Sequence, residues 1–475
     1  MPLTVLSDPD VRTLLLQLTK QDILALQQSL ADALHYYSTA TVEDDDNGCC
    51  EAYQPKGTSL KSKDGAKMVV VPASSNDGLG VKTTTLLNDR KTPTSSDTES
   101  LSSSLDALSL SQASPTTAVS SHATPTTAKG SLTLFDRSGN PRALLNTAEM
   151  TAFRTALAST MLFKKRHSVH DVTVFGSGKQ AYWHIRLSLL LRGPDIHHLN
   201  IINRDFERVH HLLERLYNPH EAPQSFNPDP THVPSYRRIE LHESLSRPKI
   251  QILTPSHGEY TRLLKETLRS SSVIYTCTSS PTPLFPASIL TSPEGRRKGR
   301  YLSSIALQAC ELAPEILQQA VAPAHQHRHF HKHAASGGAV VVDSIEACLK
   351  EAGEVMQAGL KPDQVVEIGE LVMLKRDADR RRAECQSKME EGLDDGGVEL
   401  GETKKSKKKE RSGSSGGKKK GDEEEDKAHQ GLMEWLTKGN VVYKSVGFGL
   451  MDVVIGGELV RLADERGIGT RIDDF

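Results

Sequence analysis

A glycine-rich segment at residues 172–181 carries the strongest chemical signal in this 475-residue chain. β-Branched and aromatic residues run up to Phe175, and Gly176, Gly178 and Ala181 follow in the spacing Gly-x-Gly-x-x-Ala. Such glycines allow a sharp turn out of a strand and let a pyrophosphate approach the backbone, where the first N–H groups of a helix favour phosphate. Because strand and helix patterns flank the glycines, the segment predicts a dinucleotide site rather than a purely structural turn.

The end of the next expected strand, at residues 197–204, indicates which dinucleotide binds. NAD sites usually carry an acid here, which bonds the ribose 2′-hydroxyl. This chain has Asn203 and Arg204 instead, and an arginine can pair with a 2′-phosphate. The alternative is a surface arginine beside Asp205. The pair therefore favours NADP(H) over NAD(H).

Composition gives no reason to expect nucleic acid or a membrane as partner. The 58 basic and 60 acidic residues leave a formal charge of −2. No run approaches the roughly 20 apolar residues of a membrane span, and the first ten residues lack the pattern of a secretory signal. The six cysteines show no metal-binding spacing, which favours a reducing compartment. We expect a soluble, cytoplasmic protein.

Hydrophobic periodicity predicts an α/β fold in which the glycine-rich module interrupts another domain. A Rossmann-type dinucleotide-binding domain is expected over residues 161–345. A discontinuous N-terminal α/β domain for substrate and dimerisation is expected over residues 1–160, completed by residues 346–475. Helices of this second domain are expected at 11–18, 20–37, 148–163 and 451–466, and strands at 68–72, 78–87, 131–135 and 143–145.

Three low-complexity segments interrupt this pattern. Residues 92–130 are rich in Ser, Thr and Pro and are expected to be disordered. Residues 323–338 contain five histidines at alternate positions, for which we expect a solvated tract rather than a metal site. Residues 394–428 hold adjacent basic and acidic runs, which favour a solvated linker over an anion patch or a nuclear address.

Further motifs follow one another along most of the chain outside these segments. They include Phe153-Arg-Thr-Ala156, Phe175-Gly-Ser-Gly-Lys-Gln180, Asn203-Arg204, Cys277-Thr-Ser-Ser-Pro-Thr-Pro-Leu284, Val340-Val-Val-Asp-Ser344, Glu351-Ala-Gly-Glu354 and Lys444-Ser-Val-Gly447. Their order resembles the ornithine cyclodeaminase/μ-crystallin family. The resemblance implies a homodimer formed through the N-terminal domain, a nicotinamide coenzyme, and a small imino or amino acid between the domains. It also implies hydride transfer to or from a C=N or C–N bond, as in a ketimine reductase.

The resemblance assigns roles to individual residues. Arg154 matches the family's carboxylate-binding arginine and Lys82 its substrate lysine, so both are expected to be catalytic and substrate-binding. A helix-surface arginine and a charged side chain on an edge strand are the structural alternatives. The residues expected to bind the coenzyme are Gly176, Ser177, Gly178, Lys179, Gln180, Asn203, Arg204, Cys277, Thr278, Ser279, Lys444 and Ser445.

Two positions depart from the family pattern. Gly57 stands where many relatives carry a second carboxylate-binding arginine, and Lys56 could bind substrate there only as a point charge. Gln308 lies nearest to the position of the proton-transferring aspartate of cyclodeaminases, and an amide cannot act as a general acid or base. Ornithine cyclodeamination to proline is therefore less expected than reduction of a preformed imine.

Three hypotheses about function remain. The first is an NAD(P)-dependent oxidoreductase acting on a small imino or amino acid, which Lys82 and Arg154 favour. The second is an NADPH-dependent binding protein of μ-crystallin type with little or no catalysis, which Gly57 and Gln308 favour. The third, a scaffold that recruits partners, rests on the low-complexity segments alone. No metal cofactor is expected.

Overall fold

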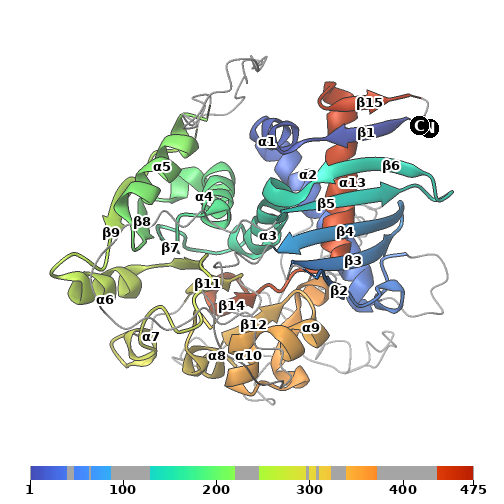
Figure 1. Ribbon diagram of the computed structural model, residues 1–475. Coiled ribbons are helices and arrows are strands. Elements are labelled where there is room, and N and C mark those ends of the chain that lie inside the picture. Colours follow the sequence, from blue (N-terminus) through green and yellow to red (C-terminus); the bar gives the residue numbers. More distant parts are fainter. Residues whose placement is uncertain are drawn as a thin grey trace, which may run out of the picture.

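The computed structural model describes residues 2–39, 48–63, 66–86, 129–219, 245–295, 299–305, 310–321, 338–371, 436–473 and 475. These residues form two α/β bodies, each built on one sheet (Figure 1). Of the three low-complexity segments, only residues 129, 130 and 338 are described, and they belong to strands. The expectations for the rest of these segments fall outside the described residues.

One body contains an eight-stranded sheet in which all strands run parallel, in the order β13-β12-β14-β11-β10-β7-β8-β9. Its strands are β7 Asp171–Phe175, β8 His198–Ile202, β9 Lys249–Leu253, β10 Val273–Thr276, β11 Tyr301–Ser304, β12 Gly338–Val342, β13 Val365–Glu367 and β14 Asn440–Lys444. The strand order reverses between β7 and β10, and dinucleotides bind parallel sheets at such a switch point.

Helices cover both faces of the parallel sheet, so its central strands are almost continuously buried. The helices are α4 Lys179–Arg192, α5 Phe206–Tyr217, α6 Tyr260–Ser270, α7 Ser288–Thr291, α8 Pro314–Ala320, α9 Ile345–Glu351 and α10 Gly353–Ala358. α4 is buried along nearly its whole length because it also packs against α3, Thr147–Phe163, of the other body. Trp183 of α4 meets Phe153 of α3 edge-on, with 5.3 Å between ring centroids.

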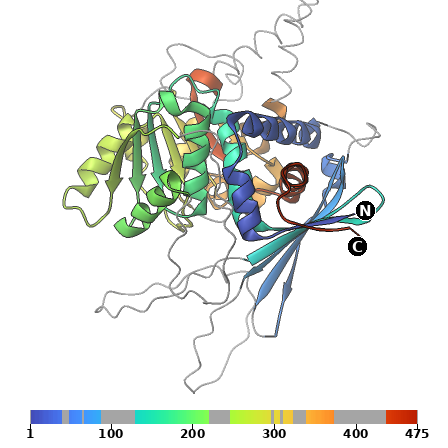
Figure 2. The same ribbon diagram turned by 90° about the horizontal axis from the view of Figure 1, so that it is seen from above.

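The other body contains a seven-stranded sheet in the order β15-β1-β6-β5-β4-β3-β2, antiparallel except for the pair β1–β6. Its strands are β1 Leu3–Leu6, β2 Thr58–Lys61, β3 Lys67–Ser75, β4 Gly78–Leu86, β5 Lys129–Phe135, β6 Pro141–Asn146 and β15 Thr470–Ile472. The helices α1 Asp8–Leu16, α2 Lys20–Thr39, α3 Thr147–Phe163 and α13 Gly449–Arg466 all lie on one side of this sheet (Figure 2). The opposite side carries no helix among the described residues.

The chain returns to the body with the seven-stranded sheet later than expected, so the predicted boundary at residue 345 is wrong. β13 and β14 both belong to the parallel sheet, and β14 lies between β11 and β12. Residues 441–444 are all buried, because a central strand of this sheet is covered on both faces. The return consists of α13, which packs on the seven-stranded sheet, and β15, which pairs with β1.

A glycine pair in α13 tests this return. A Cβ at Gly456 would clash with Cδ2 of the buried Leu132 on β5, whereas a Cβ at Gly457 would meet nothing within 4 Å. Gly456→Ala should therefore lower the free energy of unfolding by about 1–3 kcal/mol. Gly457→Ala should raise it by about 0.5–1 kcal/mol through helix propensity. Urea denaturation measures both changes, and equal changes would contradict direct packing of α13 on β5.

Candidate active site

The glycine-rich turn connects β7 to α4 at the switch point of the parallel sheet. Gly176 has a φ of 103°, which favours glycine, and a Cβ there would lie 2.7 Å from the carbonyl oxygen of Cys277. Gly178 is the N-cap of α4, and a Cβ on it would meet nothing within 4 Å. The first N–H groups of a helix have no acceptor within that helix. Open space in front of a helix N-terminus fits a pyrophosphate.

Lys179, the first residue of α4, directs its ammonium group to the body with the seven-stranded sheet. Its Nζ lies 3.1 Å from Oε1 of Glu149 on α3, and Oε2 of this buried glutamate accepts the indole N–H of Trp183 at 2.8 Å. The side chain of Lys179 thus ties α4 to α3. Ser177 and Gln180 flank the turn and are both half-buried.

Asn203 and Arg204 lie at the same edge of the sheet as this turn, because they follow β8, the neighbour of β7. The N–H of Gly176 donates to the carbonyl of Ile202 at 2.9 Å. The amide of Asn203 donates to the carbonyl of Asp205 at 2.8 Å, and Arg204 is exposed. The structure therefore brings the predicted phosphate turn and the predicted 2′-phosphate residues together.

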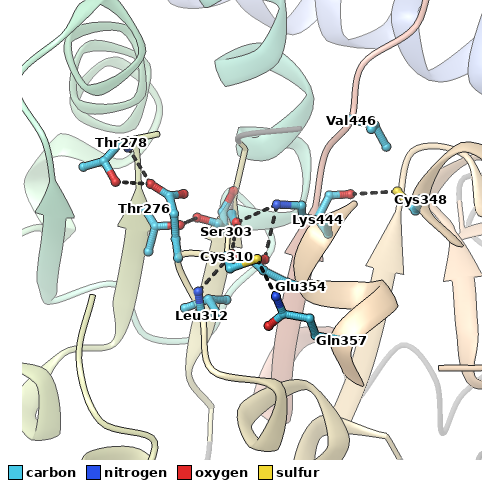
Figure 3. Close-up of polar contacts among 12 residues, drawn as sticks. Thr276, Thr278, Ser303, Cys310, Leu312, Cys348, Glu354, Gln357, Lys444 and Val446 are labelled. Carbon is cyan, nitrogen blue, oxygen red and sulfur yellow. Dashed lines mark hydrogen bonds and ion pairs between the residues drawn. The ribbon is translucent and has the colours of Figure 1, made fainter. Parts of the chain in front are cut away.

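Residues 277–279 follow β10, on the other side of the switch point from β8. Cys277 is buried, Thr278 half-buried and Ser279 exposed. The N–H of Thr278 donates to Oε1 of Glu311 at 2.7 Å, and its hydroxyl donates to the same oxygen (Figure 3). Burial raises the pKa of Glu311, although the hydrogen bonds from Thr278 oppose this effect.

Lys444, at the end of β14, forms a fully buried ion pair. Its Nζ lies 3.2 Å from Oε2 of Glu354 and donates to the hydroxyl of Ser304 at 3.0 Å (Figure 3). Oε1 of Glu354 accepts from Ser304 at 3.0 Å and from the N–H of Leu312 at 2.9 Å. The ammonium of Lys444 thus joins β14 to β11 and α10, and its coenzyme role stays a prediction.

Asp343, at the end of β12, holds the segment that leaves β14. Its carboxylate accepts from the Ser445 hydroxyl at 2.9 Å and from the N–H groups of Val446 at 3.1 Å and Gly447 at 2.6 Å. Gly447 has a φ of 71°, and a Cβ there would clash with the guanidinium of Arg154. The segment at the edge of the parallel sheet therefore packs directly on Arg154.

Lys82 and Arg154 meet at Asp452 on α13. Lys82 Nζ and Arg154 Nε lie 2.9 Å and 3.0 Å from the same oxygen, Oδ1 of Asp452. Lys82 also donates to the hydroxyl of Thr151 at 2.9 Å. At most a tenth of each charged side chain is exposed. Two cations and one anion give this buried cluster a net charge of +1, which suits a carboxylate ligand.

The protonation states in this cluster depend on burial. Burial lowers the pKa of Lys82, and the Asp452 charge opposes this effect. Burial alone would raise the pKa of Asp452, but the charges of Arg154 and Lys82 bring it below its usual value. Asp452 is therefore ionised at neutral pH and can hold both cations.

Lys56 does not join this cluster. Its side chain is 80% exposed, and its Nζ lies 3.2 Å from Oε1 of Glu346 on α9. Gly57 lies beside Val71, the residue of β3 that pairs with Lys82. Gln308 falls outside the described residues. Gly57 itself supplies no guanidinium at the position where relatives carry an arginine.

Sequence reasoning missed the four buried acids that organise the site. Asp343 and Glu354 stand inside motifs that resemble the family, so a signal was present for both. Asp452 had a weaker signal, an acid between Met451 and Val453 on a helix face that is otherwise apolar. Glu311 offered no periodic signal because it lies in a loop.

No group of three or more His, Cys, Asp or Glu side chains in the described part of the chain could hold a metal ion. None of the described helices is long and apolar enough to cross a membrane.

Comparison by sequence finds little. No protein-family model matches the chain. An uncharacterized protein of Saccharomyces cerevisiae is 26% identical over 250 residues, which cover 48% of this chain. The match spans 58% of that relative's own length.

Comparison by structure finds chains that match over their whole length. The Δ1-pyrroline-2-carboxylate reductase of Thermococcus litoralis, in complex with NADH and L-proline, has a TM-score of 0.56 at 15% identity and covers 98% of this chain and 99% of its own. An archaeal alanine dehydrogenase dimer with bound NAD has a TM-score of 0.56 at 14% identity, with 100% of both chains covered. A probable ornithine cyclodeaminase from Bordetella pertussis has a TM-score of 0.53 at 16% identity and covers 98% of this chain and 99% of its own.

This chain has the fold of these three proteins. The α/β fold class predicted from the sequence is confirmed, with a parallel Rossmann-type sheet and a second body that the C-terminus completes. The fold is also the one that the resemblance to the ornithine cyclodeaminase/μ-crystallin family implied.

The bridging role of the Asp452 carboxylate can be tested through the free energy of unfolding of variants. Asp452→Ala should lower the free energy of unfolding by about 3–5 kcal/mol, because it leaves two buried cations without a counter-charge. Asp464, an exposed residue of the same helix, accepts a hydrogen bond from Thr4 at 2.8 Å and serves as control. Asp464→Ala should cost less than about 1 kcal/mol. Chemical denaturation compares the variants, and similar losses would refute the bridging role of Asp452.

Proposed function

We propose that this chain is an NAD(P)-dependent oxidoreductase of the ornithine cyclodeaminase/μ-crystallin family that acts on the C=N or C–N bond of a small imino or amino acid. One observation carries the proposal. The buried cluster of Lys82, Asp452 and Arg154 has a net positive charge and packs against Gly447, which follows β14 at the coenzyme edge of the parallel sheet. A substrate carboxylate bound to these cations would lie beside that edge.

Different residues of the chain would bind the coenzyme and the substrate. The backbone of Gly176 and Gly178 would hold the pyrophosphate, and residues 277–279 would face the nicotinamide half, because that half lies across the switch point from β8. Arg154 would hold the carboxylate through its planar guanidinium, with Lys82 beside it. The bound coenzyme would supply a hydride to the imine carbon, and the imine nitrogen would take up one proton to give the amine.

Turnover tests this function. NADPH oxidation is measured with a cyclic ketimine carboxylate and with pyruvate plus ammonia, and release of ammonia is measured with ornithine and NADP⁺. We expect turnover of a small imino acid. Arg154→Ala should lower kcat/KM by about 100-fold, because charge-assisted hydrogen bonds to the carboxylate are lost. Arg137→Ala, in the exposed turn between β5 and β6, should leave it unchanged. Full activity of the Arg154 variant would contradict the assignment.

A second function, coenzyme binding with little or no catalysis, is favoured by the surroundings of residue 57. The nearby Lys56 pairs with Glu346, so it adds no positive charge to the cluster. Saturable NADPH binding without turnover of any imino acid tested would support this second function.

Preference for NADP(H) is a finer part of the proposal. Arg204 is exposed, whereas the carboxylate of Asp205 accepts from the N–H groups of Glu207 and Arg208 and caps α5. Asp205 is therefore less suited to bind the ribose of NAD than Arg204 is to bind a 2′-phosphate.

The arginine can be tested with two coenzymes. Arg204→Ala should raise the Kd of NADPH about tenfold, through loss of a charge-assisted hydrogen bond to phosphate. The Kd of NADH should stay the same and serves as the internal control. Calorimetric titration measures both constants, and equal weakening of the two coenzymes would argue against a 2′-phosphate contact.

The outer face of the seven-stranded sheet supports a homodimer as part of the proposal. Leu79, Leu144 and Met68 are 55%, 39% and 39% exposed, and they alternate with residues that face the helices. An open apolar sheet face of this kind is typical of an interface between copies. The archaeal alanine dehydrogenase of the same fold is a dimer.

A reducing compartment such as the cytoplasm is also part of the proposal. Cys277, Cys310 and Cys348 are free and buried. Thiols that stay unpaired are typical of a reducing environment.

A further inference from the structure

Glu311 is a buried carboxyl group that the proposed reaction leaves without a role. It lies in the loop after β11 and is 0% exposed. Its Oε1 accepts two hydrogen bonds from Thr278, and its backbone carbonyl accepts the N–H of Leu284 at 3.0 Å. Figure 3 shows Thr278 close to Thr276, the last residue of β10. Glu311 therefore supports the loop that follows β10 at both of its ends.

The bond to Glu311 decides what the Thr278 hydroxyl can do. Its hydrogen is donated to the carboxyl group, so its remaining lone pairs can only accept. Thr278 is half-buried, and its methyl group lies 3.2 Å from where a Cβ of Gly176 would stand. An acceptor beside the phosphate turn, on the β10 side of the switch point, matches a ligand N–H at the nicotinamide half of a dinucleotide.

We propose that Glu311 is a positioning residue for the nicotinamide end of the coenzyme, because it orients the Thr278 hydroxyl to accept an N–H of the carboxamide. This inference rests on the proposed coenzyme function. It deepens that function by naming a residue that acts on one half of the coenzyme only.

The pKa of the Glu311 carboxyl group reflects its burial. Burial raises its pKa, and the nearby Glu354 adds to this effect. The amide of glutamine keeps an acceptor for Thr278 at this position, whereas alanine removes it.

Two ligands distinguish binding of the nicotinamide from binding of the rest of the coenzyme. The full chain is titrated with NADPH and with 2′-phospho-ADP-ribose, which carries the same adenosine and phosphates but no nicotinamide. Glu311→Ala should raise the Kd of NADPH about tenfold and change that of the fragment by less than about twofold. Glu311→Gln should keep both constants within about threefold of the unmodified chain. Unchanged fragment binding also shows that the variants are folded.

A second variant tests whether the effect passes through the hydroxyl. Thr278→Val should weaken the binding of NADPH as much as Glu311→Ala does, and the double variant should bind NADPH no more weakly than either single variant. If Glu311→Ala weakened the binding of NADPH and of the fragment equally, Glu311 would have a purely structural role and the inference would be overturned. Unchanged NADPH binding in this variant would also overturn it. Failure of the unmodified chain to bind either ligand would instead overturn the proposed function.

Discussion

The site depends on the paired contacts of the Asp452 carboxylate with two cations. This carboxylate is buried between the two cations, Lys82 from β4 and Arg154 from α3, and it comes from α13 near the C-terminus. Without it, two positive charges would be buried side by side, which costs several kcal/mol. One acid thus joins three elements that lie far apart in the sequence.

The position of α13 depends in turn on the path of the chain out of the parallel sheet. β14 ends at Lys444, whose buried pair with Glu354 holds that strand end in place. Asp343 then holds residues 445–447 against Arg154. One short segment, residues 445–447, therefore joins the end of β14 to the cluster of Lys82, Asp452 and Arg154.

The difference between local and non-local information explains which features the sequence predicted. The glycine-rich turn was predictable because its strand, glycines and helix are adjacent in the chain, and β7 and α4 are found there. The place of β14 between β11 and β12 was not, because strand order over such separations is a tertiary property. The acid at position 452 is visible in the sequence. Its two partners, however, are brought to it only by packing of α13 on the body with the seven-stranded sheet. The roles assigned to individual site residues remain predictions.

The most direct measurement is a crystal structure of the protein with reduced coenzyme and L-proline, the ligand of the Thermococcus litoralis reductase. We expect the diphosphate at Gly176 and Gly178, and the proline carboxylate on Lys82 and Arg154 with the proline Cα facing the nicotinamide. A carboxylate bound elsewhere, or a glycine-rich turn left empty at saturating coenzyme, would contradict it.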